Sequence, residues 1–585
     1  MYIYKAPYKD MVFLSAMVYQ QHLSGVKNLS EFDPQLASNI MDEAEKFASK
    51  ILSPLNFVGD HNGCRFENGR VITPTGWKEA YQAFCQAGWV GLTLPVSCGG
   101  QGLPRHISQS VNEMWLSSNL AWSMLQALTQ SGANILSKFA NESMQRRYLS
   151  KLVSGEWTVA IALTESNAGS DLGALTTKAF PRDDGTYQIL GQKIFITYGE
   201  HDLTKNILHL VLACTPDAPN GSRSASLFLV PKYRVNDDGI ISDFNDVTCT
   251  GIERKLGLHG SPTCSIQYGE NNVCIGELVG ELHQGLKAIS LFMNEARLSC
   301  GLQGVALAQL GYQKASEYAS QRKQGYNNYG HPVTIIEHAD VKRMLLEIRS
   351  ESFALRALGY QIAAWIDCAL ANNNVYIEHN IALLIPIFKA FSTERANALI
   401  ANVVQIFGGM GVIEEVGIAQ ILRDARVLTI YEGTTGIQAL DLVFKKILAD
   451  QGATLFKLIN SFEDQIKEIV QKKHLIDFTH DLPFLLEESR AILYEVVLSL
   501  KTDIIVLQEI SAPLLESLGI IFCSFQLLKI TDYSMDVNIK KNYPGYFENT
   551  LSLTQFYLVH RLPIAIARLK TVRLSVKKRI NYNFD

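Results

Sequence analysis

The hydrophobic periodicity of this 585-residue chain changes twice, and this limits the fold more than any other feature of the sequence. From about residue 30 to 155, apolar residues recur at helical spacing. From about 156 to 285 the period is two, in segments rich in Ile, Leu, Val and Phe at Tyr187–Thr197, Ile207–Ala213 and Ala225–Val230. After Gly285 the helical period returns and persists.

The sequence therefore predicts a mostly α-helical protein with a central β domain. Its expected parts are an N-terminal helical domain (residues 1–155), a middle β domain of short strands (156–285), a helical bundle (286–450) and an extra C-terminal helical domain (455–585).

Charge and cysteine content exclude several classes of protein. A balance of 53 Lys+Arg against 57 Asp+Glu gives a net charge of −4, which argues against a strongly basic nucleic-acid-binding protein. Charged residues make up 19 %, below the typical share of about 25 %, so we expect a large core and additional subunit interface. The ten cysteines form no CxxC pair and show no zinc-site spacing, so we expect buried thiols in a reducing compartment and no metal site.

The chain also lacks obvious targeting signals. Its N-terminal residues carry charges and a proline where a signal peptide has an apolar core. The longest apolar stretches, Ile381–Phe388 and Leu518–Phe525, are shorter than the roughly 20 residues that span a bilayer. These features predict a cytoplasmic protein.

Two segments of the middle region could contact a ligand. In Thr164–Asp171 (TESNAGSD), small residues and hydroxyls leave backbone N–H groups free to approach a flat or anionic ligand, although a tight turn is the alternative. In Lys193–Thr197 (KIFIT), strand alternation places Phe195 and Thr197 on one face, where a ring could stack and a hydroxyl could donate a hydrogen bond. A combined core and surface role is the alternative for that pair.

Two further segments lie in the helical bundle. The glycines of Gln405–Gly411 (QIFGGMG) allow close approach of a ligand, but they are also typical of a helix C-terminus. Tyr431–Gln438 (YEGTTGIQ) follows Arg423–Arg426 (RDAR) and places Glu432 between an aromatic and a glycine. A carboxyl with little room for water could serve as a base with a raised pKa, whereas an exposed or capping glutamate is the alternative.

Together and in this order, the four segments resemble the acyl-CoA dehydrogenase family of flavoenzymes over roughly residues 35–450. The chain length, the N-terminal YKAP segment, Lys255–Cys264 (KLGLHGSPTC) and the C-terminal extension are most similar to a subgroup of larger bacterial members. The resemblance implies that the middle domain is β-barrel-like and that the bundle after it has four helices. It also implies FAD-dependent α,β-dehydrogenation of an acyl-CoA thioester to the trans-2-enoyl-CoA, within fatty-acid β-oxidation. Electrons would pass to electron-transfer flavoprotein.

Glu432 matches the family's commonest position for the catalytic base. In a minority of members the base lies directly before an arginine on another helix. In this chain that arginine is Arg297 and the preceding residue is Ala296, while Glu295 is rotated by about 100° around the helix. The resemblance therefore leaves Glu432 without a clear rival.

The resemblance also implies binding residues. Those expected at FAD are Leu163, Thr164, Phe195, Thr197, Arg322, Gln324, Gln405, Gly408, Gly409 and Thr434. Those expected at acyl-CoA are Ser170, Asn294, Arg297 and Gly433, with Asn294 in place of a common aspartate. Arg322 and Gln324 match residues that reach the cofactor of a neighbouring subunit, so we expect a homodimer.

Two other functions stay open at the level of sequence. An acyl-CoA oxidase would pass the electrons to oxygen. A DNA-associated member of the alkylation-response type would use a basic C-terminal domain, and the basic end of this chain (residues 561–579) could contact nucleic acid or a membrane surface. A solvated helix face is the simpler interpretation. The net charge and the intact Glu432 favour the enzyme, so we expect no nucleic-acid partner, and peripheral membrane contact stays open.

Overall fold

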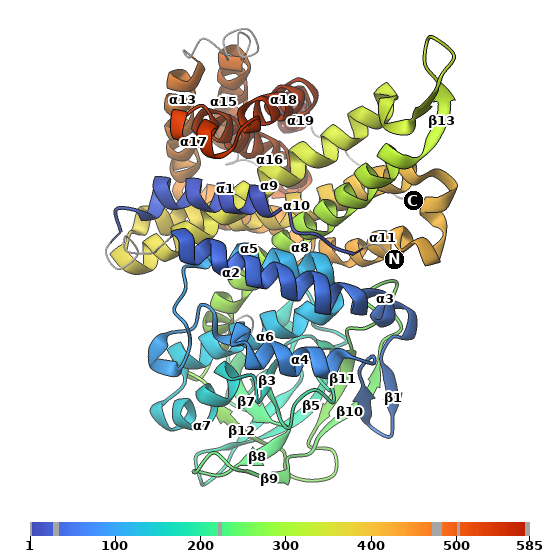
Figure 1. Ribbon diagram of the computed structural model, residues 1–585. Coiled ribbons are helices and arrows are strands. Elements are labelled where there is room, and N and C mark those ends of the chain that lie inside the picture. The colour runs from blue at the N-terminus through green and yellow to red at the C-terminus, as the bar shows by residue number, and fades with distance from the viewer. Residues whose placement is uncertain are drawn as a thin grey trace, which may run out of the picture.

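The computed structural model describes residues 3–26, 34–219, 221, 225–470, 482–499 and 504–578. Helices form the upper part of the molecule in Figure 1, and a twisted sheet with helices at its side forms the lower part. The predicted class, mostly α with a central β domain, is confirmed.

Most of the N-terminal helices share one hydrophobic core with parts of the later bundle, whereas the last of them packs with the middle sheet in a second core. They are α1 (Tyr8–Val18), α2 (Pro34–Phe47), α3 (Ser53–Asn62), α4 (Trp77–Gln86), α5 (Arg105–Ser118), α6 (Leu120–Phe139) and α7 (Glu142–Val153), with a hairpin of β1 (Arg65–Glu67) and β2 (Arg70–Ile72). Asparagine side chains fix two helix starts, because Asn119 accepts from the Trp122 N–H (3.1 Å) and Asn141 accepts from the Met144 N–H (2.9 Å).

The middle sheet has the strand order β10-β11-β5-β12-β7-β6-β3, with β4 beside β5 and β6. Its strands are β3 (Thr158–Ala162), β4 (Lys178–Pro181), β5 (Tyr187–Thr197), β6 (Ile207–Cys214), β7 (Ala225–Pro231), β10 (Val247–Ile252), β11 (Thr263–Tyr268) and β12 (Ile275–Leu278), and β8 (Tyr233–Val235) pairs separately with β9 (Ile241–Phe244). The predicted strand Tyr187–Thr197 is confirmed with the same bounds. Every residue of β6 is buried, because the strand has one core on each face.

The helical bundle is built from three long helices that cross closely. Its helices are α8 (Gly285–Gln321), α9 (Ala339–Asn372), α10 (Val375–Phe407), α11 (Ile418–Arg426) and α12 (Thr435–Leu440), and a hairpin of β13 (Lys323–Tyr326) and β14 (Pro332–Thr334) projects from the body in Figure 1. A Cβ at Gly301 of α8 or Gly359 of α9 would meet the Phe388 ring of α10, at 2.5 and 2.8 Å. Glycine at both positions therefore lets the three helices meet around one ring.

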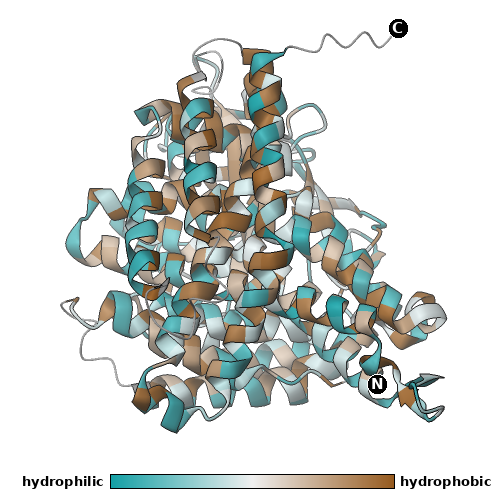
Figure 2. Cartoon of the chain, turned by 90° about the horizontal axis from the view of Figure 1, so that it is seen from above, coloured by the Kyte–Doolittle hydropathy of each residue, from teal (hydrophilic) through white to brown (hydrophobic). Residues whose placement is uncertain are grey.

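The C-terminal helices share the largest hydrophobic core with α1, α9 and α10. They are α13 (Ala453–Val470), α15 (Leu482–Ser499), α16 (Ile504–Ser534), α17 (Val537–Asn542), α18 (Tyr546–His560) and α19 (Leu562–Lys577). Figure 2 shows apolar and polar stretches alternating along the helices, as expected for helices packed on one side. A Cβ at Gly519 of α16 would lie 2.3 Å from the Phe391 ring of α10, so the extension packs directly against the bundle.

Helix α16 has 31 residues and is long and apolar enough to cross a membrane by length and composition alone. The helix is longer than the uninterrupted apolar stretch Leu518–Phe525 that it contains, and the expectation from the sequence rests on that stretch alone. Of its most apolar 18-residue window, 61 % is buried inside the protein, which is also the property of a core helix.

The basic end of the chain is largely neutralised by intramolecular ion pairs. Four of its cations contact carboxylates of α9, α15 or α16: Arg561–Glu351, Arg568–Glu516, Lys570–Glu488 and Arg573–Glu495. These contacts support the structural interpretation of this segment over a free surface for polyanions. Arg579, the last cation of the segment, lies outside the described residues.

A fully buried ion pair joins α5 to α9. Arg356 donates to both carboxylate oxygens of Glu113 (2.6–2.9 Å) and to Gln309 of α8 (2.9 Å), and Tyr360 also donates to Glu113 (3.2 Å). Both members of the pair have side chains with 0 % exposure. The pair therefore fixes the N-terminal helices against the bundle.

Arg356→Met is expected to lower the free energy of unfolding by about 3–5 kcal/mol, because it leaves the Glu113 carboxylate buried without its cation. Chemical denaturation monitored by circular dichroism measures this change. Arg343→Met on the same helix is the control. The Arg343 side chain is 44 % exposed and pairs with Asp340 and Glu347, and an exposed ion pair contributes less than about 1 kcal/mol to stability. Equal losses in the two variants would contradict the assignment.

Candidate active site

Glu432 lies in a strained turn directly before α12. Its φ is 56° and that of Gly433 is 84°, so two consecutive residues are left-handed. The cap of α12 is Thr434, whose hydroxyl accepts from the Ile437 N–H (3.3 Å). The alternative that Glu432 is a capping residue is therefore wrong, and its carboxyl is free for another role.

The surroundings of Glu432 are largely apolar but contain two cations. Burial raises the pKa of the Glu432 carboxyl above its ordinary value, and Lys389 of α10 and Arg297 of α8 oppose that rise. Arg297 is 3.4 Å from Asp441, which follows α12. Next to the carboxyl, the Tyr431 hydroxyl donates to Gln303 of α8. Glu432 thus has a raised pKa, which is the direction of shift that makes a carboxylate a stronger base.

Glu295 is a second carboxyl with a raised pKa. Burial raises it, while Arg105 and hydrogen bonds from Asn134 and Ser131 lower it. The Asn134 amide of α6 lies 3.2 Å from both carboxylate oxygens. Its carboxylate is therefore held by an amide of α6, whereas the Glu432 carboxyl faces two cations of the bundle.

The TESNAGSD segment is organised by its own glutamate. Glu165 accepts from the backbone N–H and the hydroxyl of both Thr176 and Thr177, at 2.5–3.0 Å. It also forms an ion pair with Lys193 of β5 (2.8 Å), whose Nζ donates to the Leu163 carbonyl (2.9 Å). Burial opposes ionisation of Glu165, but Lys193 and the threonine hydroxyls outweigh it and lower its pKa to about 2.

This arrangement brings Leu163 and Thr164 beside the KIFIT strand, because the Ile194 N–H donates to the Thr164 carbonyl (2.9 Å). Simple alternation, as assumed from the sequence, fails within that strand. Lys193 and Ile196 are both buried although they are three residues apart, because the pairing with β11 shifts by one residue here.

Phe195 lies in this bulge. It has a φ of 58° and a side chain that is 58 % exposed, which is unusual for a large aromatic residue in a strand. Thr197, two residues on, is partly exposed and pairs with Thr263 of β11. The exposed Phe195 ring follows Ile194, which binds the Thr164 carbonyl, and an exposed ring at this place fits the flat ring system of a flavin.

The remaining predicted residues lie in several separate parts of the structure. Ser170 and Asn294 are exposed, and Gly433 and Thr434 adjoin Glu432. Gln405, Gly408 and Gly409 are exposed where α10 ends, and a Cβ at either glycine would meet nothing within 4 Å. Arg322 and Gln324 are exposed at the base of the β13 hairpin, far from the middle sheet in Figure 1. Within one chain, these last two residues are therefore not brought to Thr164 and Phe195.

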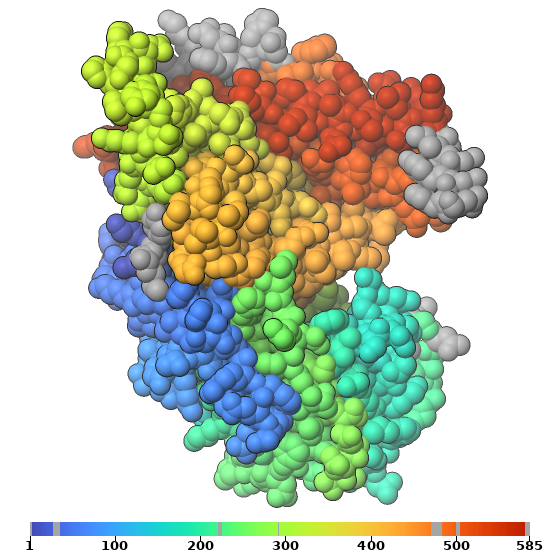
Figure 3. All heavy atoms as spheres, turned by 90° about the vertical axis from the view of Figure 1, so that its right-hand side faces the viewer, coloured from blue at the N-terminus to red at the C-terminus, as the bar shows by residue number. Residues whose placement is uncertain are grey.

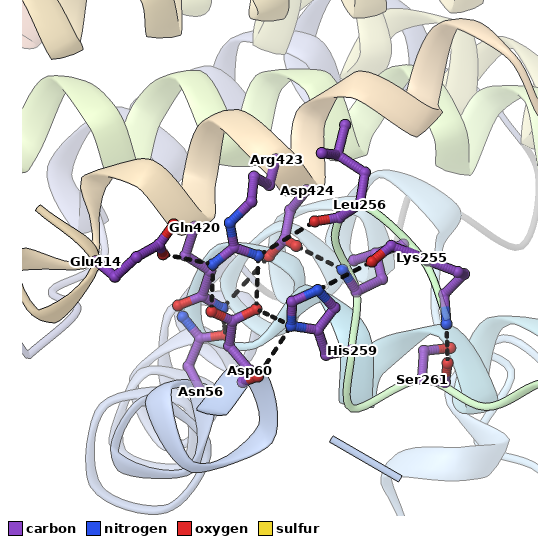
Figure 4. A network of polar contacts seen from close by, with 11 residues as sticks. Asn56, Asp60, Lys255, Leu256, His259, Ser261, Glu414, Gln420, Arg423 and Asp424 are labelled. Atoms are coloured by element: carbon purple, nitrogen blue, oxygen red, sulfur yellow. Dashed lines mark hydrogen bonds and ion pairs between the residues drawn. The ribbon is translucent and has the colours of Figure 1, made fainter. Parts of the chain in front are cut away.

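A polar network, which motif reading did not identify as a contact, joins three parts of the chain (Figure 4). Arg423 of α11 binds both carboxylate oxygens of Asp60 in α3 (3.0 and 2.6 Å), and His259 of the β10–β11 loop lies 3.0 Å from the same carboxylate. Asp424 accepts from the Leu258 N–H of that loop (2.6 Å), and burial raises its pKa to about 6. The network holds the middle sheet against the bundle.

Figure 3 shows the face on which these parts meet. The orange bundle segments lie above the green middle sheet, and the surface is hollowed between them and the neighbouring teal segments. This is the side of the molecule on which the network of Figure 4 joins the two parts.

Comparison with known proteins gives a consistent result. The N-terminal, middle and C-terminal domains of acyl-CoA dehydrogenases match residues 37–156, 160–270 and 283–447. The chain is 42 % identical over 458 residues to 3-methylmercaptopropionyl-CoA dehydrogenase of Ruegeria pomeroyi, covering 77 % of each protein. It is 37 % identical over 440 residues to a butyryl-CoA dehydrogenase of Syntrophomonas wolfei, covering 72 % of each.

Some of the matching solved structures cover the extension as well. The acyl-CoA dehydrogenase of Bacillus anthracis, complexed with FAD, shares the fold over 97 % of this chain and 92 % of that protein, at 19 % identity and a TM-score of 0.73. The resemblance found in the sequence, including that to larger bacterial members, is confirmed. This chain is an oxidoreductase that belongs to the acyl-CoA dehydrogenase family.

Proposed function

We propose that the protein removes two hydrogens from Cα and Cβ of an acyl-CoA thioester and yields the trans-2-enoyl-CoA. The observation that carries this proposal is Glu432, a carboxyl with a raised pKa in a strained turn, facing the cations Lys389 and Arg297. FAD, the cofactor of the family, accepts the hydride equivalent from Cβ when it is bound. The exposed Phe195, the Thr164 backbone, Thr197 and the open space at Gly408 and Gly409 fit that cofactor.

In this proposal Glu432 takes the α proton, and its own backbone N–H is the expected donor to the thioester carbonyl. A proton α to a thioester is a weak acid, so the base has to act where water is scarce and where a forming enolate is stabilised. Arg297, Asn294 and Ser170 are the expected contacts of the CoA part. Leu163, Gln405 and Thr434 are further residues proposed at the cofactor.

We further propose that two copies of the chain form a homodimer. Arg322 and Gln324 support this, because they are exposed on a projecting hairpin and lie far from the other proposed cofactor residues of their own chain. Electron-transfer flavoprotein is the proposed electron acceptor, as in the family that the chain belongs to. A place in fatty-acid β-oxidation and a cytoplasmic location are parts of the same proposal.

Anaerobic titration of the purified flavoprotein with acyl-CoAs of graded chain length tests this function. We expect one length class to remove the visible flavin absorption band, because the two electrons have no other acceptor. Addition of oxygen to the reduced, product-bound protein distinguishes the alternatives: slow return of the band is expected for a dehydrogenase, and fast return would indicate an oxidase. A yellow protein that no acyl-CoA reduces would overturn the proposal.

A further inference from the structure

The left-handed turn at Glu432 needs an external support. A side chain other than glycine rarely adopts a positive φ, and such a residue persists only where its surroundings hold it. Gly433 cannot be replaced easily either, since a Cβ there would lie 2.6 Å from the Gln438 amide nitrogen. Other groups of the protein therefore have to hold the backbone of Glu432 and Gly433 in this turn.

Two fully buried side chains donate hydrogen bonds to the carbonyl groups of Glu432 and Gly433. The Lys389 ammonium donates to the Gly433 carbonyl (2.7 Å). The Gln438 amide donates to the carbonyls of Glu432 (3.0 Å) and Gly433 (3.2 Å). Both side chains have 0 % exposure, so neither exchanges these contacts for water. The turn is thus held from α10 on one side and from α12 on the other.

The charged and titratable groups around Glu432 come from each element packed against it. Lys389 lies on α10, Arg297 and Cys300 lie on α8, and Tyr431 precedes Glu432 in the chain. Lys389 lowers the pKa of Glu432 more than Arg297 does. Burial lowers the pKa of Lys389 itself, and the nearby Cys300 and Glu432 oppose that lowering. Arg297 has Asp441 as a second partner, which leaves Lys389 as the main cation for Glu432.

We propose that Lys389 and Gln438 are positioning residues for proton abstraction by Glu432: both bind backbone carbonyl groups of the left-handed Glu432–Gly433 turn, and Lys389 also keeps the carboxyl ready to accept a proton. The proposal rests on the function proposed above. It explains why a lone lysine lies in the otherwise apolar run Ile381–Phe391 of a bundle helix. It also assigns separate effects to charge and to hydrogen bonding, which variants can separate.

The charge is tested by infrared titration of the Glu432 carboxyl, identified as the band that Glu432→Gln removes. In Lys389→Met the titration midpoint is expected to rise by about 1–3 pH units, because the opposing cation is gone. The acid limb of the kcat/KM profile is expected to move to higher pH by the same amount. Lys389→Arg, which keeps the charge, is expected to stay close to the wild-type midpoint. A midpoint that is unchanged in Lys389→Met would overturn this part of the proposal.

The hydrogen bonds are tested by Gln438→Met, which removes two of them without changing charge. We expect kcat to fall by about 10²-fold, because a small displacement of the base has that effect, while the midpoint of Glu432 stays in place. Lys389→Gln can still donate to the Gly433 carbonyl, so its midpoint is expected to move as in Lys389→Met while kcat at high pH is retained. An unchanged kcat in Gln438→Met would contradict the positioning role.

Lys529→Met is the matched control. Lys529 lies on α16 in the C-terminal extension and is also buried, and burial lowers its pKa to about 8. It donates to Gln361 of α9 (2.6 Å). We expect lower stability and an unchanged midpoint in this variant. The infrared titration does not depend on turnover, so the role of Lys389 can be tested even if no acyl-CoA reduces the wild-type flavin. A shift of equal size in Lys529→Met would show a general effect of losing a buried lysine and would overturn the proposal.

Discussion

Glu432→Gln is expected to lower kcat by up to about 10⁴-fold, the upper range for loss of a general base. Glutamine keeps the volume and shape of the side chain but cannot accept the α proton. Because the pKa of Glu432 is raised above its ordinary value of 4.5, the acid limb of the wild-type kcat/KM profile is expected above that pH. Stopped-flow reduction of the flavin by a saturating acyl-CoA measures the rate in both proteins.

Glu295→Gln is the control for this prediction, since Glu295 also has a raised pKa but is bound by Asn134. We expect it to retain most of the wild-type rate. FAD content has to be equal in all three proteins, so that a lost rate is not a lost cofactor. The base would be reassigned if Glu295→Gln were inactive and Glu432→Gln were not.

The second large effect is expected at Glu165. Glu165→Gln leaves Lys193 buried at 0 % exposure without a counter-charge and is expected to cost about 3–5 kcal/mol of unfolding free energy. It also releases Thr176 and Thr177 from the carboxylate, so the TESNAGSD segment is expected to lose its shape and its affinity for FAD. Denaturant unfolding gives the first quantity, and the ratio of visible to ultraviolet absorbance after gel filtration gives the second.

The same pair has a defined pH dependence. The pKa of Glu165 is lowered from 4.5 to about 2 in the folded protein, so its stabilising contribution is present above pH 4.5 and is lost as the pH falls toward 2. The double variant Glu165→Gln, Lys193→Met removes both charges and is expected to recover part of the stability lost in Glu165→Gln. The pairing would be contradicted if the double variant lost more free energy of unfolding than the two single variants lose together.

Much of the site could be predicted because its parts are local in sequence. The strand Tyr187–Thr197 has the predicted bounds, since its alternation and flanking turns are contained in the segment itself. Some contacts of the motifs are also short in sequence: Glu165 of TESNAGSD binds Thr176 eleven positions on, and Gln438 binds Gly433 within YEGTTGIQ. Motif reading predicted these segments as the site, but it did not distinguish the residues that would face a ligand from those that support the turn.

The remaining contacts join residues far apart in the chain. Arg423 and Asp60 are 363 positions apart, and Lys389 and Gly433 are 44 apart, so no local pattern pairs them. The one available signal was chemical, because a lysine inside an apolar helix needs a buried partner. The bulge at Phe195 was missed for a related reason: it depends on how β5 pairs with β11, and alternation within one strand does not contain that information.

The central claim is that Glu432 abstracts the α proton of an acyl-CoA while the β hydrogen leaves for the flavin. It is tested most directly by the deuterium isotope effects on anaerobic flavin reduction, with substrate labelled at C2 or at C3. We expect a primary isotope effect at each position in the wild-type protein, and reduction that is slower by up to about 10⁴-fold in Glu432→Gln with FAD still bound. Reduction of the Glu432→Gln protein at the wild-type rate, or reduction of the wild-type protein with no isotope effect at C2, would contradict the account.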